Sequence, residues 1–175
     1  MTRARAFFLI LMIAVLSGCS GLSGSGSTAS SIGPELKSTH RFTLMGLQNE
    51  PVSLDQVLSQ HKAVLINFWA TWCSFCIEEM PDLVKLQERL KDQGFTVLAV
   101  DVGEPAEQAA AFAKKMGLNF PIVLDTDNTV AQNYALVGIP VSYLVTSDGK
   151  IVGEYHGFSN KLVSDVENRL KSKAK

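Results

Sequence analysis

Apolar and polar residues follow two alternating patterns over most of the chain. Continuous apolar runs, which are typical of strands buried on both faces of a sheet, occupy 63–69, 95–100 and 120–124. The intervening segments 76–90 and 105–116 place apolar residues at helical spacing. Strands that alternate with helices in this way predict parallel strands covered by helices.

The remaining segments extend this sheet. Asp148 and Gly149 lie between the β-rich runs 141–145 and 151–155, which is a strong signal for a hairpin and therefore for antiparallel strands. We predict an α/β fold with a mixed central sheet flanked by helices. The shorter expected elements are a strand at 41–44, a short helix beginning near 51–54 and capped by Ser53, a helix at 129–134, and a closing amphipathic helix at 161–170.

The N-terminus has the pattern of an export signal. Arg3 and Arg5 precede an apolar run at 6–16, which is too short to cross a bilayer of about 30 Å as a helix. The tetrapeptide Leu16-Ser17-Gly18-Cys19 resembles the lipobox of bacterial lipoproteins, which implies cleavage before Cys19 and a diacylglycerol on its sulfur. An ordinary signal peptide with an incidental cysteine and an uncleaved short anchor are the alternatives.

Three parts are expected along the chain. They are a lipoprotein signal peptide at 1–18, a lipidated flexible tether at 19–33 and a folded domain at 34–175. The tether is almost entirely Ser, Gly, Ala and Thr, a composition that forms a flexible coil. Two acyl chains give stable membrane attachment. The domain is therefore expected to face the periplasm or the cell exterior from a bacterial membrane, where disulfides persist.

Composition narrows the function classes. The 16 basic and 17 acidic residues exclude an electrostatic nucleic-acid binder, which would show a basic excess. Three cysteines are too few for a disulfide-rich secreted module. A length of 175 residues favours one domain that buries its own core. We expect a monomer.

Cys73 and Cys76 are the two thiols that remain if Cys19 carries lipid. They lie where the buried strand at 63–69 meets the next helix, and their spacing places both on one helical face. Unpaired N–H groups and the helix dipole at this junction favour a thiolate at Cys73, the expected nucleophile. Cys76, one turn further, would be less exposed and would act as the resolving thiol.

Two other interpretations of this pair remain open. Half a zinc site would need further ligands, and the chain's histidines, His40, His61 and His156, are scattered singly. Two inert core cysteines are the second alternative. A disulfide across so short a loop contributes little stability in the chain-entropy model, which favours redox chemistry. No metal and no cofactor beyond the redox-active disulfide are therefore expected.

The residues around the pair resemble a known family. Phe68-Trp69-Ala70-Thr71-Trp72-Cys73-Ser74-Phe75-Cys76 resembles the thioredoxin active-site signature, and Glu79 and Pro81 follow as in CxxCxxExP. Further motifs resemble the TlpA/ResA branch of membrane-tethered thiol-disulfide oxidoreductases; they lie at 102–104, 119–121, 125–127 and 138–140. The resemblance covers about 39–170. It implies a thioredoxin-like fold with an N-terminal extension and the TlpA/ResA-type insertion.

The resemblance also implies a substrate-binding side of the site. Pro140 matches the cis-proline that faces the cysteine pair, and Ile139 before it would offer its backbone to an extended substrate peptide. Trp72 is expected at the rim of the site, while Ser74 and Phe75 between the cysteines would face the substrate and help to set the redox potential. The alternatives are a trans-proline in a loop and a core role for Trp72.

Two acidic residues match functional positions of the family. Glu79 would carry a proton during resolution of the mixed disulfide, with a solvated surface glutamate as the alternative. Asn67 replaces the buried acid that thioredoxin has on this strand, which strengthens the case for Glu79. Glu104 is expected either to tune thiol pKa values near the site or to be a simple helix N-terminal charge before Pro105.

These observations predict a dithiol-disulfide oxidoreductase that reduces disulfides of exported proteins. The family implies a membrane thiol-reductant donor of the DsbD or CcdA type, and apocytochrome c with its CxxCH thiols as one possible substrate class. The competing functions are a thiol peroxidase, which needs a Thr and Arg-rich pocket, and a copper-binding chaperone, which needs wider cysteine spacing and a supporting histidine. A non-catalytic lipoprotein scaffold is the remaining alternative.

Overall fold

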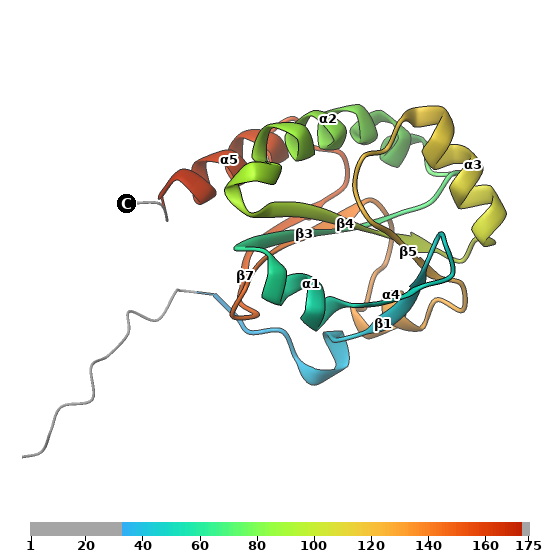
Figure 1. Cartoon of the computed structure of the whole chain (residues 1–175), viewed down its shortest axis with the longest axis horizontal. Helices are drawn as coiled ribbons and strands as arrows, with labels where there is room; N and C mark the ends of the chain where they lie inside the picture. The colour runs from blue at the N-terminus through green and yellow to red at the C-terminus, as the bar shows by residue number, and fades with distance from the viewer. Residues whose placement is uncertain (1–32, 173–175) are drawn as a thin grey trace, which may run out of the picture. The chain divides into compact units, whose positions relative to one another are not determined.

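A computed structural model describes residues 33–172 (Figure 1). Seven strands form one mixed sheet in the order β2-β1-β5-β4-β3-β6-β7. The strands are β1 (Thr43–Gly46), β2 (Pro51–Ser53), β3 (Ala63–Trp69), β4 (Phe95–Val102), β5 (Ile122–Asp125), β6 (Val141–Thr146) and β7 (Ile151–His156). The predicted α/β class and mixed sheet are confirmed.

The centre of the sheet carries the site. Strands β3, β4 and β5 are parallel neighbours, and β6 pairs antiparallel with β3. Every residue of Ala63–Trp69 is buried, as expected for a strand covered on both faces. The predicted hairpin joins β6 to β7, and Gly149 supplies the positive φ of 80° that its turn requires.

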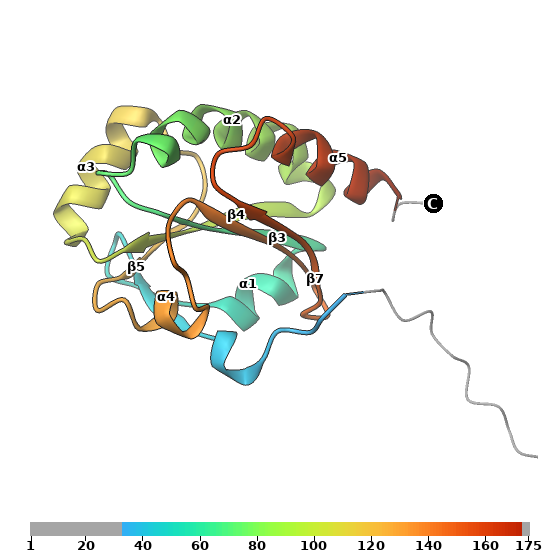
Figure 2. The ribbon, with the colours of Figure 1, turned by 180° about the vertical axis from the view of Figure 1, so that it is seen from behind.

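Five α-helices cover the two faces of the sheet. They are α1 (Leu54–Gln60), α2 (Ser74–Leu90), α3 (Ala106–Met116), α4 (Thr129–Asn133) and α5 (Leu162–Ser172). Helices α2, α3 and α5 lie on one face, and α1 and α4 lie on the other (Figures 1 and 2). Each face has its own buried apolar cluster, so α2 is packed firmly enough to place its first turn.

The first elements differ from the prediction. The first strand is shifted to Thr43–Gly46, and Pro51–Ser53 forms a second strand that pairs antiparallel with it. Ser53 occupies the N-cap of α1, but its side chain makes no capping hydrogen bond. Instead, the N–H of Leu54 donates to the Phe42 carbonyl at 3.0 Å, because the chain enters the helix directly from a paired strand.

No helix within residues 33–172 is both long and apolar enough to span a bilayer. The predicted signal peptide, Cys19 and nearly all of the predicted tether lie outside the described residues.

Candidate active site

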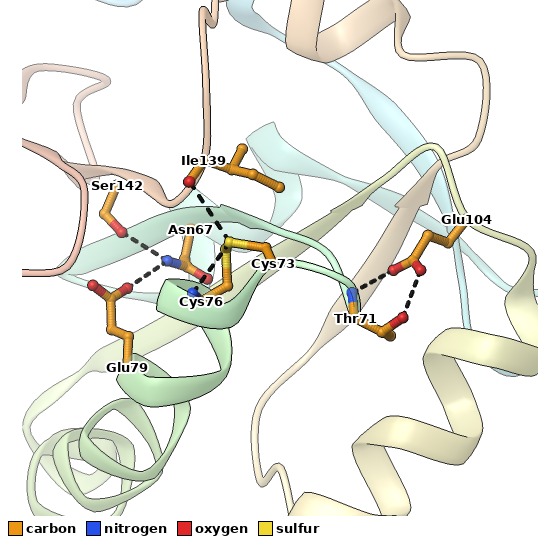
Figure 3. Close-up of a disulfide and its surroundings, with 8 residues drawn as sticks. All are labelled: Asn67, Thr71, Cys73, Cys76, Glu79, Glu104, Ile139 and Ser142. Atoms are coloured by element: carbon orange, nitrogen blue, oxygen red, sulfur yellow. Dashed lines mark hydrogen bonds between the residues drawn. A yellow bond between two sulfur atoms is a disulfide. The ribbon is translucent and has the colours of Figure 1, made fainter.

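Cys73 and Cys76 form a disulfide at the start of α2, with a Cα–Cα distance of 5.2 Å (Figure 3). Cys73 is the N-cap of α2, and its Sγ accepts a hydrogen bond from the Cys76 N–H at 3.2 Å. The N–H groups of a first helical turn have no partner inside the helix, so they are free to stabilise negative charge on this sulfur. Cys73 is 6% exposed and Cys76 is 1% exposed. The geometry therefore suits attack through Cys73.

The loop before β6 closes over the disulfide. The Ile139–Pro140 peptide bond is cis, as predicted, and the Ile139 carbonyl oxygen lies 3.6 Å from Cys73 Sγ. A disulfide sulfur carries no hydrogen, whereas a reduced Cys73 thiol could donate to this carbonyl. Val141 follows directly and pairs with Phe68 of β3, so the sheet fixes the loop beside the cysteines.

Exposed apolar side chains adjoin the cysteines in the chain or line hollows that include Ile139 or Glu79. Trp72 and Phe75 are 68% and 59% exposed. Val137 is fully exposed and lines an open apolar groove with Trp72 and Ile139. Phe158 lines a second hollow, which it shares with Glu79. These four are all but one of the large exposed hydrophobic residues in the described part of the chain, the other being Met45. Ser74, the first residue of α2, is also exposed.

Glu79 is buried one turn beyond Cys76 on α2 (Figure 3). It is 3% exposed, whereas its neighbour Glu78 is exposed. The Asn67 amide donates to Glu79 Oε1 and to Ser142 Oγ, each at 2.9 Å. Burial raises the pKa of Glu79 to about 7, although the Asn67 hydrogen bond opposes the shift. Glu79 can therefore gain or lose a proton near neutral pH, which a solvated surface glutamate would not do.

Glu104 lies on the turn between β4 and α3, and its carboxylate reaches the turn before Cys73 (Figure 3). Its Oε2 accepts from the Thr71 N–H and its Oε1 from the Thr71 hydroxyl, each at 2.6 Å. Gln108 of α3 donates to the same carboxylate. Glu104 is 4% exposed, so it is more than a solvated charge at a helix start.

Sequence reasoning missed four polar residues that support the site. They are Thr71, Asp101, Gln108 and Ser142. A polar residue in an otherwise apolar strand was the available signal for Ser142, which interrupts the run at 141–145. Asp101 gives the same signal at the end of the run at 95–100.

Asp101 is fully buried, and its carboxyl group lies beside Glu104. Burial raises its pKa to about 8, and the neighbouring Glu104 adds to the shift. Asp101 therefore holds a proton at neutral pH.

The histidines weighed for a metal site lie apart from the cysteine pair in the sequence, and His156 has a carboxylate partner. His156 is the last residue of β7 rather than a loop residue, and its Nε2 lies 2.7 Å from Glu154 Oε1. Within residues 33–172, no three His, Cys, Asp or Glu side chains converge on one point.

The chain is similar in sequence to known proteins. The AhpC/TSA family model matches residues 37–153. The thiol-disulfide oxidoreductase ResA of Bacillus cereus is 29% identical over 98% of both chains. The ResA of Halalkalibacterium halodurans is 33% identical over 76% of this chain and 75% of its own length.

A solved structure agrees with these relatives. The thioredoxin domain of a thiol-disulfide oxidoreductase from Bacteroides vulgatus superposes with a TM-score of 0.67 at 31% identity. The match covers 74% of this chain and 93% of that domain. The chain therefore belongs to the TlpA/ResA-like branch of the AhpC/TSA family, and it is a thiol-disulfide oxidoreductase with a thioredoxin-like fold.

Proposed function

We propose that this oxidoreductase works as a reductase of disulfides in exported proteins. The observation that carries the proposal is the Cys73–Cys76 pair at the first turn of α2, with the exposed side chains of Trp72 and Phe75 next to the cysteines in the chain. A small thiol needs no such surface, whereas an unfolded polypeptide offers apolar groups to cover it.

The reaction transfers two electrons from the dithiol to the substrate. The Cys73 thiolate attacks a substrate disulfide, forms a mixed disulfide and releases one substrate thiolate. Cys76 then loses its proton and attacks the Cys73 sulfur. The mixed disulfide breaks, the second substrate sulfur leaves, and the protein is left with the Cys73–Cys76 disulfide. Glu79 accepts the Cys76 proton and returns it to the leaving thiolate, because its pKa of about 7 suits both steps.

The substrate is held along the loop before β6. The backbone of Ile139 pairs with an extended peptide beside the disulfide, as in strand addition. Trp72 and Phe75 cover apolar side chains on either side of the target cysteines. Apocytochrome c, whose CxxCH thiols must be reduced before haem is attached, is one substrate class that fits.

The oxidised pair must be reduced again by a dithiol. We place this donor in the membrane, as a thiol-transfer protein of the DsbD or CcdA type. Lipid on Cys19 and the predicted tether at 19–33 would keep the domain within reach of the donor. The protein would then act on the outer side of the membrane, as a monomer without a bound cofactor.

A thiol peroxidase would need an arginine beside the reactive cysteine, and the described arginines are paired elsewhere. Each arginine within residues 33–172 lies next to a carboxylate: Arg41 next to Asp55, Arg89 next to Glu167 and Arg169 next to Asp165. The Thr71 hydroxyl donates to Glu104 rather than to the sulfur. A peroxidatic thiolate would therefore have neither group beside it.

A trapping experiment tests the proposal. A Cys76→Ser variant keeps the nucleophile and loses the resolving thiol, so it should accumulate a mixed disulfide with a CxxCH peptide presented in its disulfide form. Replacing Trp72 and Phe75 by alanine should raise KM for a disulfide-bonded polypeptide about tenfold, with little effect on a small aromatic disulfide. Met45→Ala is the matched control, because Met45 is exposed but lies on β1.

Three results would count against the proposal. They are the absence of a trapped adduct, equal losses on large and small disulfides, and rapid consumption of hydrogen peroxide by the reduced protein. Tight stoichiometric binding of copper to the reduced pair would favour the copper chaperone instead.

A further inference from the structure

The turn before α2 determines where the attacking sulfur lies. The Cys73 N–H donates to the Ala70 carbonyl at 3.2 Å and closes a tight turn that contains Thr71 and Trp72. Cys73 then takes the N-cap position, from which its Sγ receives the Cys76 N–H. A small displacement of the turn would remove the sulfur from this position.

Glu104 fixes this turn from the segment between β4 and α3. It receives both the backbone N–H and the hydroxyl of Thr71, each at 2.6 Å. Gln108 of α3 donates to Glu104 and also to Thr71 Oγ1, the latter at 2.7 Å. All the donors point at the carboxyl group, so Glu104 acts only as an acceptor, as a carboxylate does. Hydrogen bonds to an ionised group are about twice as strong as neutral ones.

The carboxyl group of Asp101 on β4 lies beside Glu104. Asp101 is protonated at neutral pH, so it adds no second charge beside Glu104. Figure 3 shows that Glu104 approaches Thr71 but lies apart from the two sulfur atoms. Its contact with the site is therefore made through Thr71.

We propose that Glu104 is a positioning residue that keeps Cys73 at the N-cap of α2 in the dithiol state, acting through Thr71. The inference rests on the proposed function, in which the dithiol is the reactive state. In the oxidised protein the disulfide itself holds Cys73 to Cys76. After reduction that covalent link is gone, and the turn is held by hydrogen bonds. Loss of Glu104 should therefore displace Cys73 from the N-cap more in the reduced protein than in the oxidised protein.

A direct electrostatic effect of Glu104 on Cys73 would shift the pKa of the Cys73 thiol in the opposite direction from a positioning effect. A negative charge near Cys73 disfavours its thiolate, so removal of the charge would lower the pKa of the Cys73 thiol. Loss of positioning removes the Cys76 N–H from the sulfur and raises that pKa. The direction of the change separates the two roles.

The test is a pH titration of Cys73 reactivity in the reduced full chain, purified in detergent. Alkylation by iodoacetamide is followed at Cys73 by peptide mass spectrometry. For Glu104→Ala we expect the alkylation midpoint to move to higher pH. At neutral pH, alkylation and exchange with a peptide disulfide should both slow about tenfold.

Two variants at position 71 extend the test. Thr71→Val removes only the hydroxyl and should shift the midpoint in the same direction by less. Thr71→Ser restores the hydroxyl and should return the midpoint towards the wild-type value. If Glu104→Ala does not fold, this pair decides the question.

Gln87→Ala is the matched control for stability. Gln87 is a buried residue about three turns beyond Cys76 on α2, and it accepts the Val97 N–H at 2.8 Å. Its loss should lower the melting temperature without moving the Cys73 titration.

A midpoint that falls in Glu104→Ala would overturn the inference in favour of a charge effect. A midpoint that stays in place, or moves equally in Gln87→Ala, would reduce Glu104 to a structural role. If the wild-type pair formed no reversible disulfide, the proposed function would fail instead. The titration of Cys73 would still decide the positioning role.

Discussion

Two buried glutamates flank the cysteine pair, and they differ in how many hydrogen bonds they receive. Glu79, on α2, receives one hydrogen bond, from the Asn67 amide. Glu104, beside the preceding turn, receives the N–H and hydroxyl of Thr71 and the amide of Gln108. The two side chains are almost equally buried, at 3% and 4% exposure.

The number of donors decides what each carboxyl group can do. Burial costs a carboxylate its hydration, and hydrogen bonds to the charged form offset that cost. With a single donor, the pKa of Glu79 rises to about 7, so this group suits proton transfer. With three donors, Glu104 holds the backbone in place. The same residue type at similar depth therefore serves one site in two ways.

The largest effect is expected when Glu79 is replaced by a residue that cannot exchange a proton. Glu79→Gln keeps the shape of the side chain but cannot exchange a proton, so disulfide exchange at pH 7 should slow about a hundredfold. In the wild type we expect the rate of disulfide exchange to change with pH around the Glu79 pKa of about 7. This break in the pH profile should disappear in Glu79→Gln. Stopped-flow fluorescence with a peptide disulfide between pH 5 and 9 measures both.

Glu78→Gln is the control for this change, because Glu78 is the exposed neighbour on the same helix. It should behave like the wild type. A Glu79→Gln protein that kept the pH break would show that the break belongs to another group and would remove Glu79 from the proton path.

The two glutamates should have opposite effects on stability. The folded protein holds the Glu79 proton up to about pH 7, whereas the unfolded chain releases it near 4.5. Stability is therefore lost as the pH rises through this window, and Glu79→Gln abolishes that loss. At pH 8 this variant should be more stable than the wild type by about 1–3 kcal/mol.

Glu104→Gln should instead be less stable, by about 1–3 kcal/mol, because an amide cannot accept all of the bonds that the carboxylate receives. Urea denaturation of the oxidised protein at pH 5 and pH 8 measures both variants. If both substitutions raised, or both lowered, the free energy of unfolding at pH 8, the proposed difference between the two glutamates would be wrong.

A smaller effect is expected from the single donor to Glu79. Asn67→Ala removes the hydrogen bond that holds the pKa of Glu79 down. The pH break in exchange should move upward by about half a unit to one unit. Ser142→Ala leaves the bond from Asn67 to Glu79 in place and should leave the break unchanged. A downward shift in Asn67→Ala would contradict this arrangement.

Local patterns predicted most of the fold. The buried runs, the helical spacings and the Asp148-Gly149 turn each carry a signal within a few residues. The β1–β2 pairing was missed because Pro51–Ser53 is short and is stabilised by its partner strand. The redox-active cysteine pair was predicted from its spacing at a junction between strand and helix, and the cis Ile139–Pro140 bond was predicted through the family resemblance.

The supporting network of the site could not be predicted in the same way. Thr71 is 33 residues from Glu104, and Asn67 is 75 residues from Ser142. These contacts depend on how strands β3, β4 and β6 lie next to one another, which no local pattern specifies. A polar residue in an apolar run marks a position that needs a partner, but it does not identify the partner.

The most direct test of the central claim is the reduction potential of the Cys73–Cys76 pair. The protein is equilibrated in thiol–disulfide buffers, and the redox state is followed by tryptophan fluorescence and confirmed by alkylation and mass. A reductase should give a reversible two-electron couple nearer to about −270 mV, as in thioredoxin, than to about −120 mV, as in a disulfide donor. A value near the oxidising end, or the absence of a reversible couple, would contradict the account.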